Sequence, residues 1–381
     1  MTVIYIESQD TLATACDALQ SQPWIAIDTE FSRERTYYAK LCLIQIASSD
    51  QVILIDPLKL ESLEPLNAIL TNPNILKVFH AAYQDLEIFY TLFGQLPGPL
   101  FDTQLAAALL GLGNQTGYAN LVYEIMGVSL NKSQTRTDWS KRPLSDKQIE
   151  YAIDDVRYLF QLYPKIDAQL TSLGRRDWLQ ADLEKLSDSR SFEIDQDKLW
   201  CKVKGYQRLS GIQLAILKQL ATWREGLAQK QDRPRKHALR DDILISLARL
   251  KPESREAIAS IPNLLRSLSN SLIDEVIAIN KQVLKSSKDE WPVLPSYTRL
   301  SKQEEILADA LMIVLKWAAK KHHLSSEIIA TRKDIEKLIL DKDTQPIMQG
   351  WRFDYAGKYL SDFLQGNAQL RAIQGKLELA Y

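Results

Sequence analysis

Four acids and a tyrosine in the first half of the chain have types and spacings that could support metal-dependent chemistry. Asp28 and Glu30 lie two residues apart in the apolar segment IAIDTEF. On a strand, that spacing projects both carboxylates from the same face, while Ile25 and Ile27 point into the core. Adjacent acids repel each other, and a divalent cation would compensate their charge. The alternative is a strand that ends at the solvent, where the carboxylates are hydrated.

A third acid, Asp85, follows the segment ILKVFHA and falls in the first turn of the helix expected at 84–93. An acid at this position also interacts favourably with the helix dipole, so its place alone does not identify a metal ligand. Asp102, in FDTQLAAALL, is better explained as the N-cap of its own helix and is left out of the site.

The remaining candidates lie on a helix that begins at a capping box, Ser145 to Gln148. Tyr151 and Asp155 are four residues apart and therefore share one face of this helix. Asp154 is an alternative to Asp155, and spacing alone does not choose between them. Asp28, Glu30, Asp85 and Asp155 together provide the four acids that a pair of Mg²⁺ or Mn²⁺ ions about 3.5–4 Å apart requires.

The elements that would position these side chains form an α/β domain over residues 1–190. Three apolar segments rich in Ile, Leu and Val are expected to be strands, at 24–31, 41–48 and 51–57. The last two are joined by a short polar turn and predict an antiparallel hairpin. A helix (63–70), a strand (75–81) and a helix (84–93) follow, and this alternation predicts a mixed sheet with helices on its faces.

Beyond about residue 190 the strand signal disappears, and two helical domains are expected at 205–288 and 298–381. Ser210 and Ser301 each open a capping-box pattern, 91 residues apart, and Trp223 and Trp317 are 94 residues apart. The two blocks therefore resemble diverged copies of one helical module. The segment KSSKDEWPVLPSY (285–297) is predicted to link them.

Composition is typical of a globular protein, with 45% hydrophobic and 25% charged residues. Residues 1–190 carry 16 basic and 24 acidic side chains, whereas 191–381 carry 31 and 24, so the second half is basic and suits a polyanionic partner. No export signal or membrane span is evident, and the three cysteines are expected to be reduced. These features predict a cytoplasmic protein.

The motifs DTE, H-x4-D and Y-x3-D, in this order, resemble the DEDD superfamily of 3′-5′ exonucleases in its tyrosine branch. The stretch 130–159, with the block DWSKRPL, is similar to the ribonuclease D family in particular. The segments LCLIQIA and FDTQLAAALLG share this likeness, and the helical blocks resemble the HRDC module of that family, present twice. The resemblance covers nearly the whole chain and favours Asp155 over Asp154.

This resemblance implies a ribonuclease H-like nuclease domain that removes nucleoside 5′-monophosphates from RNA 3′ ends, transfer RNA precursors among them. Separately, three domains in one chain could work together as a monomer, which is the state we expect. It implies two divalent metal ions, Mg²⁺ or Mn²⁺, with Asp28 shared between them. Glu30 and Asp155 would complete one site and Asp85 would serve the other. Tyr151, whose ordinary pKa is near 10, would orient the attacking water and not act as a base.

RNA contacts are expected from side chains around the site and from the basic half of the chain. His80 is placed to touch the terminal nucleotide, although a structural hydrogen bond at the strand end explains it equally well. The expected basic contacts are Lys132, Arg136, Lys141 and Arg142 near Trp139, and Lys230, Arg233, Arg235, Lys236 and Arg240 in the segment KQDRPRKHALR. A solvated loop is the alternative for this segment, and Trp139 could belong to the core.

Two rival functions are a DNA exonuclease of the same branch and a catalytically inactive RNA-binding protein. The catalytic residues do not separate RNA from DNA, because the chemistry spares the 2′ position. The paired helical modules favour RNA, and the intact set of four acids argues against an inactive protein.

Overall fold

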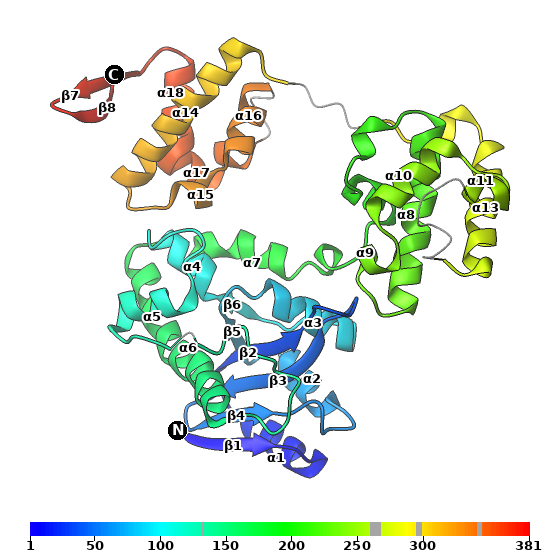
Figure 1. Cartoon of the computed structure of the whole chain (residues 1–381). Helices are drawn as coiled ribbons and strands as arrows, with labels where there is room; N and C mark the ends of the chain where they lie inside the picture. The colour runs from blue at the N-terminus through cyan, green and yellow to red at the C-terminus, as the bar shows by residue number, and fades with distance from the viewer. Residues whose placement is uncertain (132, 260–267, 295–298, 341–344) are drawn as a thin grey trace. The chain divides into compact units, whose positions relative to one another are not determined.

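The computed structural model describes residues 1–131, 133–259, 268–294, 299–340 and 345–381 (Figure 1). The chain divides into two compact units. The first consists of Met1–Glu30, Leu41–Ser191 and Thr298–Tyr381, and the second of Phe31–Lys40 and Phe192–Tyr297. Among the described residues, no helix combines the length and the apolar character that crossing a bilayer requires.

A six-stranded sheet forms the centre of the α/β layer in the first unit. Its strands are β1 (Thr2–Ile6), β2 (Trp24–Ser32), β3 (Lys40–Ala47), β4 (Gln51–Ile55), β5 (Leu76–Phe79) and β6 (Leu100–Asp102), in the order β1-β4-β3-β2-β5-β6. The β3–β4 pair is antiparallel, as the hairpin pattern predicted, whereas β1–β4, β2–β5 and β5–β6 are parallel. The predicted mixed sheet is therefore confirmed, but the short edge strands β1 and β6 were not predicted.

Helices cover this sheet. They are α1 (Gln9–Leu19), α2 (Glu64–Leu70), α3 (Tyr83–Phe93), α4 (Thr103–Leu109), α5 (Tyr118–Met126), α6 (Asp146–Ser172) and α7 (Gln180–Leu186), with 3₁₀ turns η1 (Arg176–Leu179) and η2 (Ser189–Ser191). Helices α4 and α6 begin at the caps that the sequence predicted. Ser145 and Gln148 form the predicted capping box of α6. The Asp102 carboxylate accepts from two backbone N–H groups of α4, which confirms it as an N-cap.

The second unit is a helical bundle in which α8 packs against α10 and α13 (Figure 1). Its elements are η3 (Gln196–Lys202), η4 (Tyr206–Arg208), α8 (Ile212–Lys230), α9 (Arg235–Ala238), α10 (Asp241–Leu250), α11 (Arg255–Ala259), α13 (Asn270–Leu284) and η5 (Lys288–Glu290). The capping box predicted at Ser210 does not form. The helix begins at Ile212, after Gly211 at φ +52°, and no side chain caps it.

The predicted linker 285–297 is structured in part, because it contains η5 and because Trp291 packs against the core of this bundle. Residues 295–297 of that prediction lie outside the described ranges.

The C-terminal part of the first unit is a second set of helices, in which α14 packs against α16 and α18. Its elements are α14 (Lys302–Lys321), α15 (Ser326–Ile329), α16 (Arg332–Leu340), η6 (Pro346–Met348), α17 (Gly350–Arg352), η7 (Phe353–Gly357), α18 (Lys358–Leu364), β7 (Gln369–Ile373) and β8 (Lys376–Ala380). The capping box at Ser301 forms as predicted. The β7–β8 hairpin was not predicted, since an all-helical block was expected there.

These C-terminal helices share one hydrophobic core with the α/β layer. Arg175, three residues after the end of α6, is buried and donates to the carbonyl oxygens of Leu109, His322 and His323 at 2.7, 2.6 and 3.2 Å. Trp178 and Trp351 stack nearly parallel with ring centroids 4.5 Å apart. The helix that carries Tyr151 and Asp155 is thus held at its far end by the C-terminal helices.

Candidate active site

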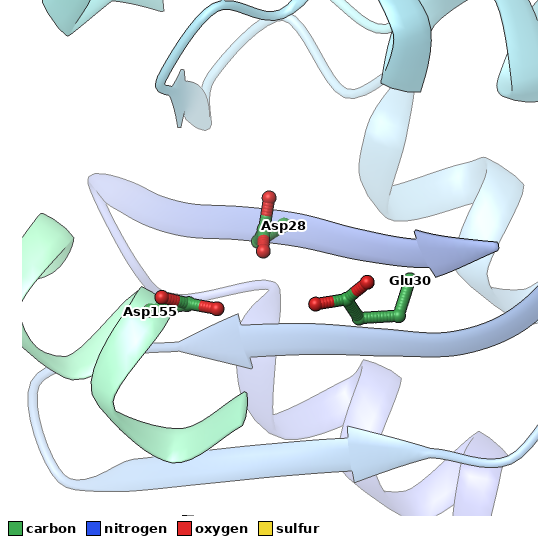
Figure 2. A group of neighbouring side chains, drawn as sticks. All are labelled: Asp28, Glu30 and Asp155. Carbon is green, nitrogen blue, oxygen red and sulfur yellow. The ribbon is translucent and has the colours of Figure 1, made fainter. Parts of the chain in front are cut away.

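Three of the predicted acids face one another between strand β2 and helix α6. One carboxylate oxygen from each of Asp28, Glu30 and Asp155 lies within 4.8 Å of the others (Figure 2). Asp28 and Glu30 share a face of β2, as the strand period predicted. Asp155 lies in α6, whose buried stripe, including Ala152, Val156 and Leu159, packs that helix against the core.

The electrostatics of this cluster are unfavourable without a cation. Burial raises the pKa of Asp28 to about 6. Burial and then the charges of Asp28, Asp155 and Asp85 raise the pKa of Glu30 to about 10. Within the described ranges, no Lys or Arg forms an ion pair with these acids. An all-oxygen donor set with unneutralised negative charge is what a hard divalent cation requires, so these residues fit such an ion.

The fourth acid, Asp85, borders the cluster without joining the three-acid group. It is buried in the first turn of α3, and the Thr29 hydroxyl donates to its carboxylate at 2.5 Å. Burial and the nearby charge of Asp28 raise the pKa of Asp85 well above its ordinary value. Thr29 was not predicted, because the strand period places it on the face opposite to Asp28 and Glu30.

Tyr151 lies one helical turn before Asp155 and is half-buried. Its hydroxyl is 3.4 Å from the hydroxyl of Thr135, and its ring centroid is 6.0 Å from that of Trp139. Burial and the charge of Asp155 raise the pKa of Tyr151, while a hydrogen bond with Tyr151 counteracts the rise at Asp155. The phenol therefore keeps its proton at neutral pH.

Asp28, Asp155 and Tyr151 line a hollow of about 330 Å³, within the size range of ligand pockets. Its other walls include His80, Tyr118, Leu130, Asn131 and Thr135. His80 Nδ1 is 3.0 Å from the Thr103 hydroxyl, so the structural hydrogen bond considered for it exists, and the ring still faces the hollow.

Tyr118 is a wall residue that sequence reasoning missed. Its hydroxyl donates to the backbone oxygen of Asp154 at 3.0 Å, which ties the start of α5 to α6 beside the acids. The segment TGYAN carries no spacing that would have indicated this contact. The side chain of Asp154 itself pairs with Arg157 and does not join the cluster.

The side chains predicted to contact RNA differ in their exposure and in whether they already form ion pairs. Arg136, Lys141, Lys230, Arg233 and Lys236 are exposed. Lys132 lies outside the described residues. Arg240 is exposed and pairs with Asp242, and Arg235 is half-buried and pairs with Glu225 in the second unit.

Arg142 and Trp139 are not placed for RNA binding. Trp139 is buried in the core. The side chain of Arg142 is only 17% exposed and pairs with the buried Asp56. The expectation that Arg142 contacts RNA is therefore at odds with the geometry, because its charge is already compensated inside the domain.

The chain is similar to known proteins along nearly its whole length. Residues 3–171 match the family model of the 3′-5′ exonuclease domain, and residues 213–279 match that of the HRDC domain. The chain is 37% identical to ribonuclease D of Sphingobium indicum, with 98% of this chain and 97% of the relative covered. It is 38% identical to ribonuclease D of Jannaschia sp., with 98% of each covered.

A solved structure, that of Escherichia coli RNase D, described as an exoribonuclease involved in structured RNA processing, superposes with a TM-score of 0.81. The identity is 34%, over 97% of this chain and 100% of that one.

Proposed function

This chain belongs to the ribonuclease D family of 3′-5′ exoribonucleases, and we propose that it trims the 3′ ends of structured RNA, transfer RNA precursors among them. Each turn of the reaction would release a nucleoside 5′-monophosphate and leave a shortened 3′-hydroxyl end. The observation that carries this proposal is the cluster of Asp28, Glu30 and Asp155 beside a hollow of about 330 Å³.

We assign the metal ligands to Asp28, Glu30, Asp85 and Asp155, with Asp28 shared between two ions, Mg²⁺ or Mn²⁺. Such ions, when bound, lower the pKa of water and stabilise charge on the attacking and leaving oxygens. Three facing carboxylates without a basic partner in the described ranges support this assignment. Asp85, held by Thr29 at the border of the cluster, would complete the donor set.

Tyr151 is assigned to orienting the attacking water. A phenol that keeps its proton donates a hydrogen bond but does not act as a base. Its position one turn before Asp155, on the wall of the same hollow, supports this role. His80 and Tyr118 would face the terminal nucleotide from other walls of the hollow.

We assign RNA binding outside the active site to exposed basic side chains. In the second unit, Lys230, Arg233 and Lys236 are exposed around the start of α9. Lys236 and His237 line two hollows of the second unit, and other basic side chains line these hollows as well. Arg136, beside the active-site hollow, would add a contact in the first unit.

We also propose that the C-terminal helices are a second, diverged HRDC module. The starts of α14, α15 and α16 follow those of α8, α9 and α10 by 90, 91 and 91 residues. Offsets that differ by no more than one residue at three successive helices support duplication of one module. The C-terminal copy would differ in its β7–β8 hairpin and in the core it shares with the α/β layer.

A decisive test uses a structured RNA with an unpaired 3′ tail, labelled at its 5′ end, and a DNA of matching sequence. With Mg²⁺ or Mn²⁺ we expect stepwise shortening of the RNA tail and release of 5′-monophosphates, and EDTA should stop both. Faster digestion of the DNA would favour the rival function, a DNA exonuclease. Binding of RNA without shortening would favour an inactive RNA-binding protein.

We further propose that the protein acts in the cytoplasm and as a single chain. The second point is supported because the acids, the tyrosine and the hollow all belong to one unit of one chain. Sedimentation of the RNA-free protein at working concentration would test the second point. A dimer that loses activity on dilution would contradict it.

A further inference from the structure

We propose that the ion pair between Arg142 and Asp56 positions Tyr151 for catalysis, and that it acts through Trp139. This inference deepens the proposed function and rests on the role assigned there to Tyr151. It makes Arg142 a positioning residue, in contrast to the RNA contact that its charge and its neighbours in the sequence suggested.

The guanidinium group of Arg142 is fully used inside the domain. Its Nε and Nη2 donate to the two carboxylate oxygens of Asp56 at 2.5 and 2.7 Å. Its Nη2 also donates to the carbonyl oxygen of Cys42 at 2.6 Å, and its Nη1 donates to those of Trp139 and Lys141, both at 2.8 Å. An arginine has five N–H donors, and these contacts use five. No donor is left for a phosphate.

The partner of Arg142 is fixed in the sheet. Asp56 follows the last residue of β4, is fully buried, and also accepts a hydrogen bond from the Tyr5 hydroxyl at 3.2 Å. Cys42 lies in the neighbouring strand β3. The pKa of Asp56 is lowered by its contacts with Arg142, against the effect of burial, so the carboxylate stays charged. Arg142 therefore ties the segment before α6 to two adjacent strands.

That segment forms one side of the environment of Tyr151. Trp139, whose carbonyl oxygen Arg142 holds, is 3% exposed and lies against the Tyr151 ring. Thr135, earlier in the same segment, is 3.4 Å from the Tyr151 hydroxyl. Contacts thus run from the sheet through Arg142 and Trp139 to the ring of Tyr151.

A group that orients water by a hydrogen bond is sensitive to small displacements, since a shift of about 1 Å can cost about 10²-fold in rate. Tyr151 is only half-buried, so its orientation depends on the few residues that contact its ring. Without the hydrogen bonds of Arg142, Trp139 should be released and the Tyr151 ring should move. The acids on β2 are held by the sheet and should keep their positions, so the reaction should be slowed and not abolished.

The test compares Arg142→Gln and Arg142→Lys in the full chain, with RNA and Mn²⁺. Lysine keeps the charge but cannot make five bonds in a fixed plane. We expect both variants to lower kcat by about tenfold or more, with KM and the salt dependence of RNA binding within about twofold of wild type. An RNA contact predicts the opposite pattern: a raised KM and a weaker salt dependence for Arg142→Gln, with kcat unchanged and Lys close to wild type.

Combination with Tyr151→Phe separates positioning of Tyr151 from a general structural role. If Arg142 acts through Tyr151, Arg142→Gln should slow the Tyr151→Phe enzyme by less than about twofold. An equal loss in both backgrounds would overturn the inference. Trp139→Phe, which leaves the ion pair intact, provides a second arm if Arg142→Gln does not fold, and its effect should also disappear in the Tyr151→Phe background.

The wild-type enzyme distinguishes the two levels of the proposal. If it releases no nucleotides from RNA with Mn²⁺, the proposed function fails. If it is active but the variants behave additively with Tyr151→Phe, only the positioning role of Arg142 fails.

Discussion

Two groups of charged side chains, one half-buried and one largely buried, lie in the α/β layer of the first unit, and they are built in opposite ways. Asp28, Glu30 and Asp155 bring like charges together without a basic partner in the described ranges. Asp56 and Arg142 bring opposite charges together, and all five N–H donors of the guanidinium form hydrogen bonds. One group is incomplete without a cation and the other is complete.

This difference separates residues that act on a ligand from residues that hold the fold. Burying a carboxylate without compensation destabilises the folded state, so such a cluster is expected where a metal or a reaction needs it. A compensated pair can be more deeply buried and still charged, and yet have no ligand.

Removal of one acid from the cluster should abolish activity without harming the fold. We expect Asp28→Asn and Asp155→Asn to lose about 10³-fold or more in RNA hydrolysis, the scale of losing a principal electrostatic group. In EDTA both should unfold at or above the wild-type temperature, because a repelling charge is gone. Asp154→Asn is the matched control and should stay near wild type, since that side chain pairs with Arg157. Equal loss in Asp154→Asn and Asp155→Asn would contradict the assignment of Asp155.

Removal of one partner from the compensated pair should have the opposite result. Asp56→Ala leaves the Arg142 guanidinium largely buried and unpaired, which typically costs about 3–5 kcal/mol of unfolding free energy. Urea unfolding in EDTA would measure this as a lower midpoint. A loss below about 1 kcal/mol, the value of a surface ion pair, would mean that the pair does not hold the fold.

The raised pKa of Asp28 should be visible in the pH dependence of stability. An acid whose pKa is raised on folding binds protons more strongly in the folded state, so stability falls as pH rises from its unfolded pKa to its folded pKa. For Asp28 this window runs from 3.8 to about 6. Metal-free protein should therefore lose stability across it, and Asp28→Asn should lose less. Thermal unfolding in EDTA at several pH values would test this, and identical slopes would refute it.

The smallest effect is expected at the exposed basic side chains. Changing Lys230, Arg233 and Lys236 to Gln should leave kcat unchanged and weaken RNA binding. The slope of log affinity against log salt should fall by about 0.7 for each phosphate that these side chains no longer neutralise. Binding measured by fluorescence anisotropy at several salt concentrations would suffice. An unchanged slope would show that these side chains are solvated and do not touch RNA.

The parts of the site that could be predicted are those that follow from periodicity and capping. The two-residue period of β2 placed Asp28 and Glu30 on one face, and the capping box at Ser145 fixed the start of α6. Both depend on local geometry alone. The same reasoning failed at Ser210, because Gly211 adopts a positive φ and the helix begins after it without a side-chain cap.

What could not be predicted depends on partners that are distant in the sequence. Arg142 appeared to be an exposed basic residue because its partner, Asp56, lies 86 positions earlier. Tyr118 joins the site through a backbone oxygen of α6, 36 positions later, which no side-chain pattern encodes. The three-residue strand β6 is likewise set by its pairing with β5. The composition of β1, TVIYI, is typical of a strand, so β1 could have been predicted.

The central claim, that the three-acid cluster is built for a divalent cation, is tested most directly by calorimetric titration of Mn²⁺ into metal-free protein. Two buffers of different ionisation enthalpy would report the protons released. The wild type should bind Mn²⁺ with release of protons, since carboxylates with raised pKa values must lose them, and Asp28→Asn should bind far more weakly. Absence of binding by the wild type, or equal binding by Asp28→Asn, would contradict the claim.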